Sequence, residues 1–485
     1  MTYTVLRILT HVLGIVGFAS LIPLAVAYHA DEPEMFSVFV PPMALAWIMA
    51  ILFRVRARGK ARIIGIQDAF GVVGGIWVAI CVFGSIPLYL SGYFPSFTDA
   101  LFESVSGFTT TGATVLPDVE KLPRSVNMWR CLSHWLGGMG VVALTVAMMP
   151  LLGAGGFRLI KAEATGPDKG KFTASIASTA KILWFIYIGM TAVQSIMLWY
   201  SGMDVIDAVA HSFSTVGTGG FSTRNASIGA FAMPAAEWVC TLFMFLSSVN
   251  FALYCRIFTG RISEVAKNSE LRAFVFIVVS AILSIFLFEL SCGDRHEEGL
   301  FRDVCFQAIS VISSTGFMTR DYTTFIPACQ AVIFSLFFIG GCSGSTAGGV
   351  KVVRLTVLAK QSINEIRRLV HPYGVFSLRL NGIAARESVV ATVAAFVFLY
   401  FVLVFATTVI GALCGLDGVS AFTGALSMVG NVGPAFGSLG PSANCGDIPV
   451  LLKWWYMIAM LAGRLEIYTL LILLGCLVKS RKRGL

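Results

Sequence analysis

Asp, Ser and Gly residues recur at one fixed spacing four times in this 485-residue sequence. Each copy has a helix-capping residue, a Ser seven positions later and a Gly thirteen positions after the cap: Asp99, Ser106 and Gly112; Asp207, Ser214 and Gly220; Asp303, Ser310 and Gly316; Ser420, Ser427 and Gly433. Because Asp and Ser are favoured N-caps, each copy predicts a short helix aimed at a glycine turn. Four such units around one axis could form an ion pore.

The four turns contain no charged side chain. In chain order they consist of Thr110, Thr111 and Gly112; Thr218, Gly219 and Gly220; Ser314, Thr315 and Gly316; Asn431, Val432 and Gly433. Backbone carbonyls can replace the hydration shell of a cation, whereas acidic or basic rings are typical of other filters. The C-terminal end of a short helix also favours a cation. The turns therefore predict a filter for a monovalent cation, with potassium dehydrated more easily than sodium.

An ordinary outer loop with a capped interfacial helix is the alternative for any one copy, because Asp, Ser and Gly are common loop residues. The fourfold repetition favours re-entrant pore loops. Irregular backbone at membrane depth is tolerated only where protein or water surrounds it, so the four turns should face a shared centre.

The composition indicates that these units lie in a membrane. Hydrophobic residues make up 56% and charged residues 13% of the chain, against about 25% charged residues in soluble domains. Apolar stretches near the length of a membrane span, about 20 residues, occupy 4–28, 37–53, 71–92, 127–153, 181–201, 236–259, 273–292, 327–358, 388–414 and 450–478. The sequence thus predicts an all-α polytopic membrane protein with about ten transmembrane helices.

Basic residues follow every even-numbered span and so mark the cytoplasmic side. They include Arg54, Arg56, Arg58, Lys60 and Arg62; Arg158, Lys161, Lys169 and Lys171; Arg256, Arg261, Lys267 and Arg272; many within 351–386; and Lys479, Arg481, Lys482 and Arg483. Both termini are therefore expected in the cytoplasm and all four turns outside. Topology and anionic lipid account for the net charge of +9, so nucleic-acid binding is not expected.

Spans and turns together predict five segments. Two N-terminal helices occupy 1–66, and four span, pore-loop, span repeats occupy 67–172, 173–268, 269–375 and 376–485. The last apolar stretch of the third repeat is too long for one span and is interrupted by small and polar residues: Gly340, Gly341, Cys342, Ser343, Gly344, Ser345, Thr346, Ala347, Gly348 and Gly349. We expect a broken helix inside the pore below the turns; a small-residue packing face is the alternative.

Arg464 lies inside the last apolar span, where a charge is costly and usually functional. Glu466 is a candidate partner, although residues two apart on a helix face different ways. A purely structural alternative is an Arg that ties helix carbonyls together. His134 is expected to be a packed residue rather than a proton relay.

The cysteine residues are interpreted as small hydrophobic side chains of the spans. A disulfide among the cysteines near the outer span ends stays an open alternative, because connectivity cannot be deduced from sequence; these are Cys292, Cys329, Cys414 and Cys445. No nucleophile, metal or phosphate-binding pattern suggests an enzyme.

Several segments resemble the bacterial Trk-type potassium uptake proteins over nearly the whole chain. They are 107–114 (GFTTTGAT), 211–215 (HSFST), 219–223 (GGFST), 341–351 (GCSGSTAGGVK), 431–434 (NVGP) and 463–467 (GRLEI). The resemblance implies four repeats around one pore, with filter glycines at Gly112, Gly220, Gly316 and Gly433. Gly112, rather than a Ser, implies potassium permeation.

The same resemblance implies a gating role for residues 341–349, Lys351 and Arg464, with Arg464 facing the permeation path. It further implies a homodimer in the bacterial inner membrane and a cytosolic, nucleotide-binding regulatory ring of TrkA type, for which 360–386 is a plausible docking surface. Potassium is the permeant ion, and no organic cofactor is expected.

Two other transport classes stay open. One is a secondary transporter coupled to H⁺ or Na⁺, which predicts inverted repeats and a buried acidic coupling residue. The other is the potassium-translocating subunit of an ATP-driven pump.

Overall fold

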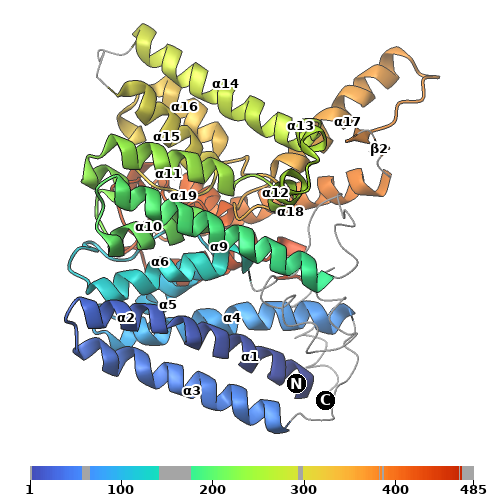
Figure 1. Cartoon of the computed structure of the whole chain (residues 1–485). Helices are drawn as coiled ribbons and strands as arrows, with labels where there is room; N and C mark the ends of the chain where they lie inside the picture. The colour runs from blue at the N-terminus through green and yellow to red at the C-terminus, as the bar shows by residue number, and fades with distance from the viewer. Residues whose placement is uncertain are drawn as a thin grey trace.

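Long apolar helices form the frame of the computed structural model, which describes residues 3–56, 66–140, 176–292, 299–381, 383–384, 387–468 and 470–471 (Figure 1). The N-terminal part has three helices: α1 (Tyr3–Ala19), α2 (Leu21–His29) and α3 (Glu34–Arg56). Helices α1 and α3 pack against each other, and α2 packs against α6. This part thus lies beside the first repeat.

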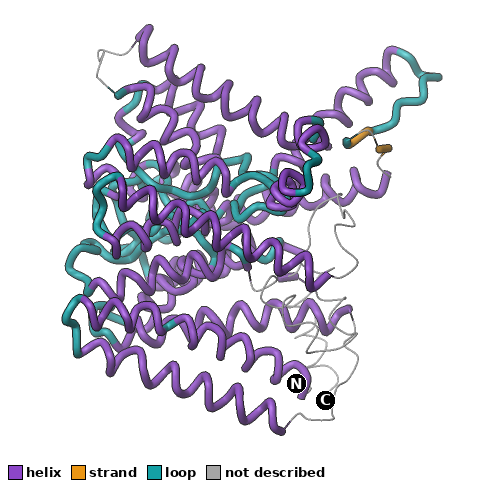
Figure 2. Tube along the Cα trace, in the orientation of Figure 1, coloured by secondary structure: helices purple, strands orange, loops and turns teal. Residues whose placement is uncertain are grey.

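The rest of the described chain repeats one order of helices four times. Each group begins with a long helix: α4 (Ile66–Leu90), α9 (Ile176–Tyr200), α14 (Ser269–Cys292) and α18 (Glu387–Leu413). A short helix follows in each: α5 (Phe97–Phe108), α10 (Val205–Gly217), α15 (Leu300–Ile312) and α19 (Gly418–Gly430). Figure 2 shows loop segments passing through the middle of the bundle between these helices, where surrounding protein can satisfy their backbone groups.

The second helix of each group is short or interrupted. These helices are α6 (Arg124–Gly138), α11 (Pro234–Ser247) with α12 (Phe251–Phe258), α16 (Pro327–Leu336) with α17 (Val352–Val370), and α20 (Val450–Arg464). Helices α11 and α12 meet at a bend of 92°. The predicted interruption of the third group is confirmed, because no helix covers the residues from Phe337 to Lys351.

The remaining elements are short. They are α13 (Ile262–Ala266), the 3₁₀ turns η2 (Ser227–Phe231), η3 (Tyr322–Thr324) and η4 (Gly437–Leu439), and an antiparallel pair of strands, β1 (Arg379–Leu380) and β2 (Ile383–Ala384). Helix α17 extends away from the bundle toward this pair (Figure 1).

Within the described ranges, six helices are long and apolar enough to cross a membrane, and the bent pair α11–α12 makes a seventh. The polytopic helical fold is therefore as predicted. The sequence expectation of ten spans differs because 127–153 and 450–478 run into residues outside the described ranges, and 327–358 is broken. An apolar stretch reports burial in the membrane region but not helix continuity.

The predicted caps of the four short helices are wrong, by three residues in α5, α10 and α19 and by four residues in α15. The N-caps are Ser96, Asp204, Gly299 and Asp417. Asp99, Asp207 and Ser420 therefore occupy the third helical position, and Asp303 occupies the fourth. Acidic residues are also favourable within the first turn, so composition alone does not separate the two positions.

Some predictions fall on residues that the structure does not describe. They are the basic residues in 57–65, 141–175 and 472–485, which were used to orient the chain, and the repeat boundary at 172. The four repeat boundaries stay predictions. No disulfide forms among Cys329, Cys414 and Cys445, which are free thiols; the side chain of Cys292 lies outside the described set.

Candidate functional site

The four glycine turns share one backbone conformation. In each turn the residue two before the glycine and the glycine itself have positive φ: Thr110 (55°) and Gly112 (81°), Thr218 (55°) and Gly220 (84°), Ser314 (53°) and Gly316 (75°), Asn431 (55°) and Gly433 (96°). Non-glycine residues rarely adopt positive φ. The same uncommon pair in all four turns shows that they are equivalent structures.

Each turn is also closed by the same hydrogen bond. In every turn the backbone N–H of the residue directly before the glycine donates to the backbone carbonyl of the repeated Ser. The four bonds are Thr111 to Ser106 (2.9 Å), Gly219 to Ser214 (2.9 Å), Thr315 to Ser310 (3.0 Å) and Val432 to Ser427 (3.0 Å). The bond satisfies a carbonyl that the helix end leaves without a partner. The conserved spacing of Ser and Gly within this chain thus reflects backbone geometry.

The four turns pack into a closed ring. A Cβ on Gly112 would lie closer than 3.0 Å to the carbonyl oxygen of Gly219, which precedes Gly220. The same holds for Gly220 against Thr315, Gly316 against Val432, and Gly433 against Thr111. Each glycine therefore contacts the next turn, and the fourth turn contacts the first. This arrangement brings together all twelve residues that the sequence predicts as the filter.

A cavity of about 140 Å³ lies against all four of these glycines. Its other lining residues come from the segments that follow the turns, among them Thr114, Ser222, Met318 and Pro434. The ring of turns therefore forms one wall of a shared chamber, to which the buried Arg130 also contributes.

The interrupted segment of the third repeat contacts three of the turns. Thr346 Oγ1 donates to the carbonyl oxygen of Val216 at 3.0 Å, just before the second turn. The N–H of Gly348 donates to Ser314 Oγ of the third turn at 2.6 Å. A Cβ on Gly348 would collide with the carbonyl of Gly430, beside the fourth turn. The segment thus lies directly against the ring, on the side where the short helices end.

A side chain of α14 and a backbone carbonyl between α11 and α12 hold the segment there. Ser343 N donates to Glu270 Oε1 of α14 at 2.5 Å, and Cys342 N donates to the carbonyl of Ser248 in the α11–α12 bend at 2.8 Å. Lys351 has positive φ (69°), and its Nζ bonds the carbonyl of Ala347 within the segment. The conformation of the interrupted segment therefore depends partly on Ser248, which lies outside the third repeat.

Arg464 connects this segment to the first repeat. Its Nη1 donates to Thr346 O at 2.8 Å, and its Nη2 donates to Gly137 O at 2.6 Å and Gly138 O at 2.9 Å. Glu466 pairs instead with Arg354 at 2.7 Å, so the candidate pair of Arg464 with Glu466 is wrong. Side chains two apart point to different faces, whereas carbonyls at a helix end need donors.

Two further observations concern residues near the turns. His134 is fully buried, its Nδ1 is 2.8 Å from Gly107 O, and its ring lies 4.1 Å from that of Phe221; its predicted packed role is confirmed. The buried ion pair of Glu103 and Arg130 was not predicted. The available signal was a charged residue inside the short helix of the first repeat and another inside the stretch 127–153, which was predicted to span the membrane.

The fold and the ring of turns define a polytopic helical membrane protein of the ion-transport class. The chain belongs to the TrkH family of cation transport proteins, whose family model matches residues 42–482.

Characterised relatives extend over most of the chain. The Trk system potassium uptake protein TrkH of Halomonas elongata is 37% identical, covering 90% of this chain and 91% of its own. TrkG of Escherichia coli K12 is 34% identical, covering 96% and 97%. The crystal structure of the potassium transporter TrkH from Vibrio parahaemolyticus superposes with a TM-score of 0.86 at 34% identity, covering 97% of this chain and 98% of that one. The chain is thus an integral inner-membrane protein of the Trk potassium uptake family, and a transporter rather than an enzyme.

Proposed function

We propose that this protein takes up potassium through a channel-like pore whose filter is the ring of four glycine turns. The observation that carries the proposal is the closed cycle in which each filter glycine packs against the carbonyl that precedes the next one. Such a cycle surrounds one axis, as a permeation path requires. The family membership supports potassium as the transported ion.

The chemistry of the turns suits a monovalent cation. Positive φ at alternate residues reverses the local twist of the chain, which allows successive carbonyls to face the same side. Carbonyl rings can replace water around a cation, and no Asp, Glu, Lys or Arg occurs among the twelve turn residues. Potassium loses its water more readily than sodium, so a neutral carbonyl filter favours potassium.

A gate formed by residues 341–349 and Lys351, locked by Arg464, is the second part of the proposal. The contacts of Thr346 with Val216 and of Gly348 with Ser314 support a position of this segment across the inner end of the proposed filter. Arg464 fixes the segment to the end of α6 and brings a positive charge to the same region. Lifting the segment would open the path.

Partners and orientation complete the proposal. We infer a homodimer with a TrkA-like cytosolic regulatory ring, and both termini in the cytoplasm; lipid surrounds the long helices. Support for a docking role of 360–386 is the position of α17 away from the bundle (Figure 1) and its exposed apolar side chains, which include Ile366 and Leu369.

Cation flux into liposomes tests the filter. The purified protein is reconstituted and measured with K⁺, Rb⁺, Na⁺ and Li⁺ gradients beside Gly112→Ser, which adds a side chain where Gly219 O leaves no room. Downhill K⁺ and Rb⁺ flux, with weaker selectivity in the variant, supports the proposal. Flux that requires an H⁺ or Na⁺ gradient indicates a coupled transporter, and no flux without ATP hydrolysis by a partner indicates a pump subunit.

Replacing residues 340–349 with a short linker tests the gate. The change removes the contacts with Val216 and Ser314, so Rb⁺ flux in the absence of any partner should rise. Unaltered or abolished flux in a correctly assembled protein argues against a gate.

A further inference from the structure

Glu103 and Arg130 form an ion pair that is almost completely withdrawn from solvent. Arg130 Nε and Nη2 each lie 2.8 Å from Glu103 Oε1, and the two side chains are 0% and 1% exposed. Burying two charges costs free energy that their attraction often only balances, so such a pair is weak evidence of a stabilising role. Ionisable residues inside a membrane protein more often mark function.

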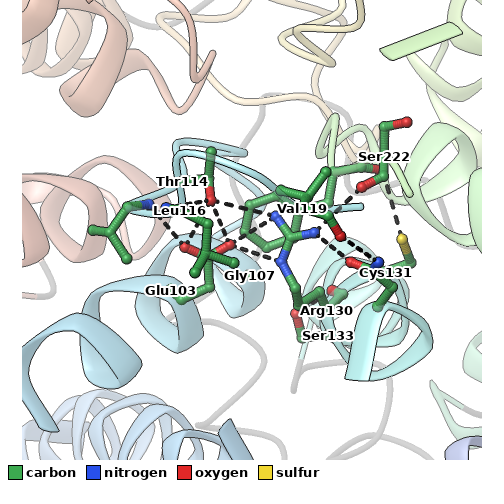
Figure 3. A network of polar contacts seen from close by, with 12 residues as sticks. Glu103, Gly107, Thr114, Leu116, Val119, Arg130, Cys131, Ser133 and Ser222 are labelled. Atoms are coloured by element: carbon green, nitrogen blue, oxygen red, sulfur yellow. Dashed lines mark hydrogen bonds and ion pairs between the residues drawn. The ribbon is translucent and has the colours of Figure 1, made fainter. Parts of the chain in front are cut away.

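Glu103 holds the segment that follows the first turn. Its Oε1 and Oε2 accept hydrogen bonds from Thr114 Oγ1 at 2.9 and 3.1 Å (Figure 3). Oε2 also accepts from the N–H of Val115 at 3.0 Å. Thr114 lies two residues after Gly112. The carboxylate therefore fixes the residues that directly follow the first turn, Thr114 and Val115, which we call its outer arm.

Arg130 reaches the corresponding segment of the second turn. Its Nη1 donates to the carbonyl of Ser222 at 3.3 Å (Figure 3). Its guanidinium lies 4.3 Å from the centroid of the Phe221 ring. Nη1 also donates to Asn127 Oδ1 at 2.8 Å. Ser222 lies two residues after Gly220, so one ion pair connects the outer arms of two neighbouring turns.

The charge of Arg130 lies at the wall of the path that a cation would take. Arg130 lines the cavity that all four turn glycines share. Glu103 cancels this charge at direct contact. Without Glu103 a permeating cation would meet an unbalanced positive charge in a region of low dielectric, where charges act strongly.

The other three repeats use different links at the position of Glu103. The equivalent residues, four after Asp207, Asp303 and Ser420, are His211, Gln307 and Gly424. His211 Nε2 lies 2.8 Å from Ser222 Oγ, and Gln307 Nε2 donates to Arg320 O at 2.7 Å. The position therefore carries a charged link in the first repeat and a neutral or no side-chain link elsewhere in the ring.

We propose that the Glu103–Arg130 pair determines ion selectivity by positioning the first and second turns, and that it determines the uptake rate by neutralising the outer wall of the path. Both residues are positioning residues, since they act through the turns. This inference rests on the proposed filter function. It separates two effects: the geometry of the turns sets selectivity, and the charge balance sets the rate.

Three variants separate the charge from the geometry: Glu103→Gln, Arg130→Gln and the double variant. Rb⁺ uptake and the Rb⁺/Na⁺ ratio are measured in liposomes. Glu103→Gln should lower Rb⁺ uptake about tenfold, because Arg130 is left uncompensated. Arg130→Gln should lower the Rb⁺/Na⁺ ratio about fivefold, because the second arm loses its link. The double variant should recover Rb⁺ uptake to about a third of wild type or more, while the ratio stays low.

Asp99→Asn is the matched control. It breaks a second buried pair of the same short helix, Asp99 Oδ1 with Lys453 Nζ at 2.7 Å, and neither residue lines the cavity. Its Rb⁺/Na⁺ ratio should equal that of wild type. An equal loss of selectivity in Asp99→Asn and Arg130→Gln, or a double variant as slow as Glu103→Gln, overturns the inference.

Arg130→Lys keeps the test decisive where a neutral variant fails to assemble. It retains the charge but loses the guanidinium fork, so uptake should stay near wild type while the ratio falls; an unchanged ratio overturns the inference. The filter proposal fails separately. It is overturned if the wild-type protein shows no preference for Rb⁺ over Na⁺, or if Gly112→Ser leaves the Rb⁺/Na⁺ ratio unaltered.

Discussion

The four glycine turns and the breaks in the second helices follow opposite rules within one molecule. The four turns share their positive-φ pairs, their closing hydrogen bond and their contact with the next turn. The second helices differ from each other: α11 bends by 92° into α12, whereas residues 337–351 separate α16 from α17. The repeated geometry is kept where four backbones surround the proposed ion path. It is abandoned where the path is proposed to be closed.

The contacts within the ring explain why all four turns must keep the same geometry. Each glycine leaves no room for a Cβ beside a carbonyl of the neighbouring turn. A shift in one turn therefore displaces the next, because close-packed interiors transmit strain. The described residues between α16 and α17 form no such cycle, and they contact unlike elements through hydrogen bonds and through the close packing of Gly348 against Gly430. Variants in the two regions should consequently fail in different ways.

Gly220→Ala should give the largest effect. The new methyl group meets the carbonyl of Thr315, and the residue must keep a φ of 84°, which together cost about 1–3 kcal/mol or more. Selective Rb⁺ uptake should fall about tenfold to a hundredfold. Gly418→Ala is the control, since a Cβ there meets no atom within 4 Å. Equal uptake in the two variants would remove the ring as the selective element.

Arg464→Ala should raise Rb⁺ flux, whereas Gly220→Ala lowers it. It removes three hydrogen bonds that link Thr346 to the end of α6, and bonds of a charged donor contribute about 1.5–3 kcal/mol each. Downhill Rb⁺ flux should rise about tenfold with its selectivity retained. Arg464→Lys keeps the charge and should raise flux less. Wild-type flux in a folded Arg464→Ala protein would leave Arg464 as a structural tie alone.

Gly348→Ala should raise flux by a smaller factor. Its φ is ordinary, so the cost comes only from the collision of the new Cβ with Gly430 O. The segment can retreat from the ring by giving up the bond to Ser314, and we expect about a threefold increase in Rb⁺ flux. A fall in flux with altered Rb⁺/Na⁺ ratio would mean that the ring yields instead, and that the two regions are not independent.

The sequence was sufficient to predict the four turns, which depend on local backbone geometry, but not the side-chain contacts between distant parts of the chain. The spacing of Ser and Gly predicted four equivalent turns because each turn depends on local backbone geometry. The small residues after Ile339 predicted the broken helix for the same reason. Contacts between residues far apart in the sequence could not be predicted in this way. Arg464 bonds a carbonyl more than 300 residues away. Glu103 and Arg130 lie on different helices, so their spacing in the sequence does not indicate that they pair.

Glu32→Gln should give the smallest effect and marks the limit of the comparison. Glu32, in the connection between α2 and α3, accepts from Arg124 N at 2.7 Å and from Ser125 N at 3.2 Å, and so caps α6. A lost cap costs about 1 kcal/mol, which should lower the unfolding temperature in detergent slightly. Because α6 keeps its contacts with the turns, Rb⁺/Na⁺ selectivity should not change. A changed ratio would show that the N-terminal helices position the filter, and that the ring is not self-sufficient.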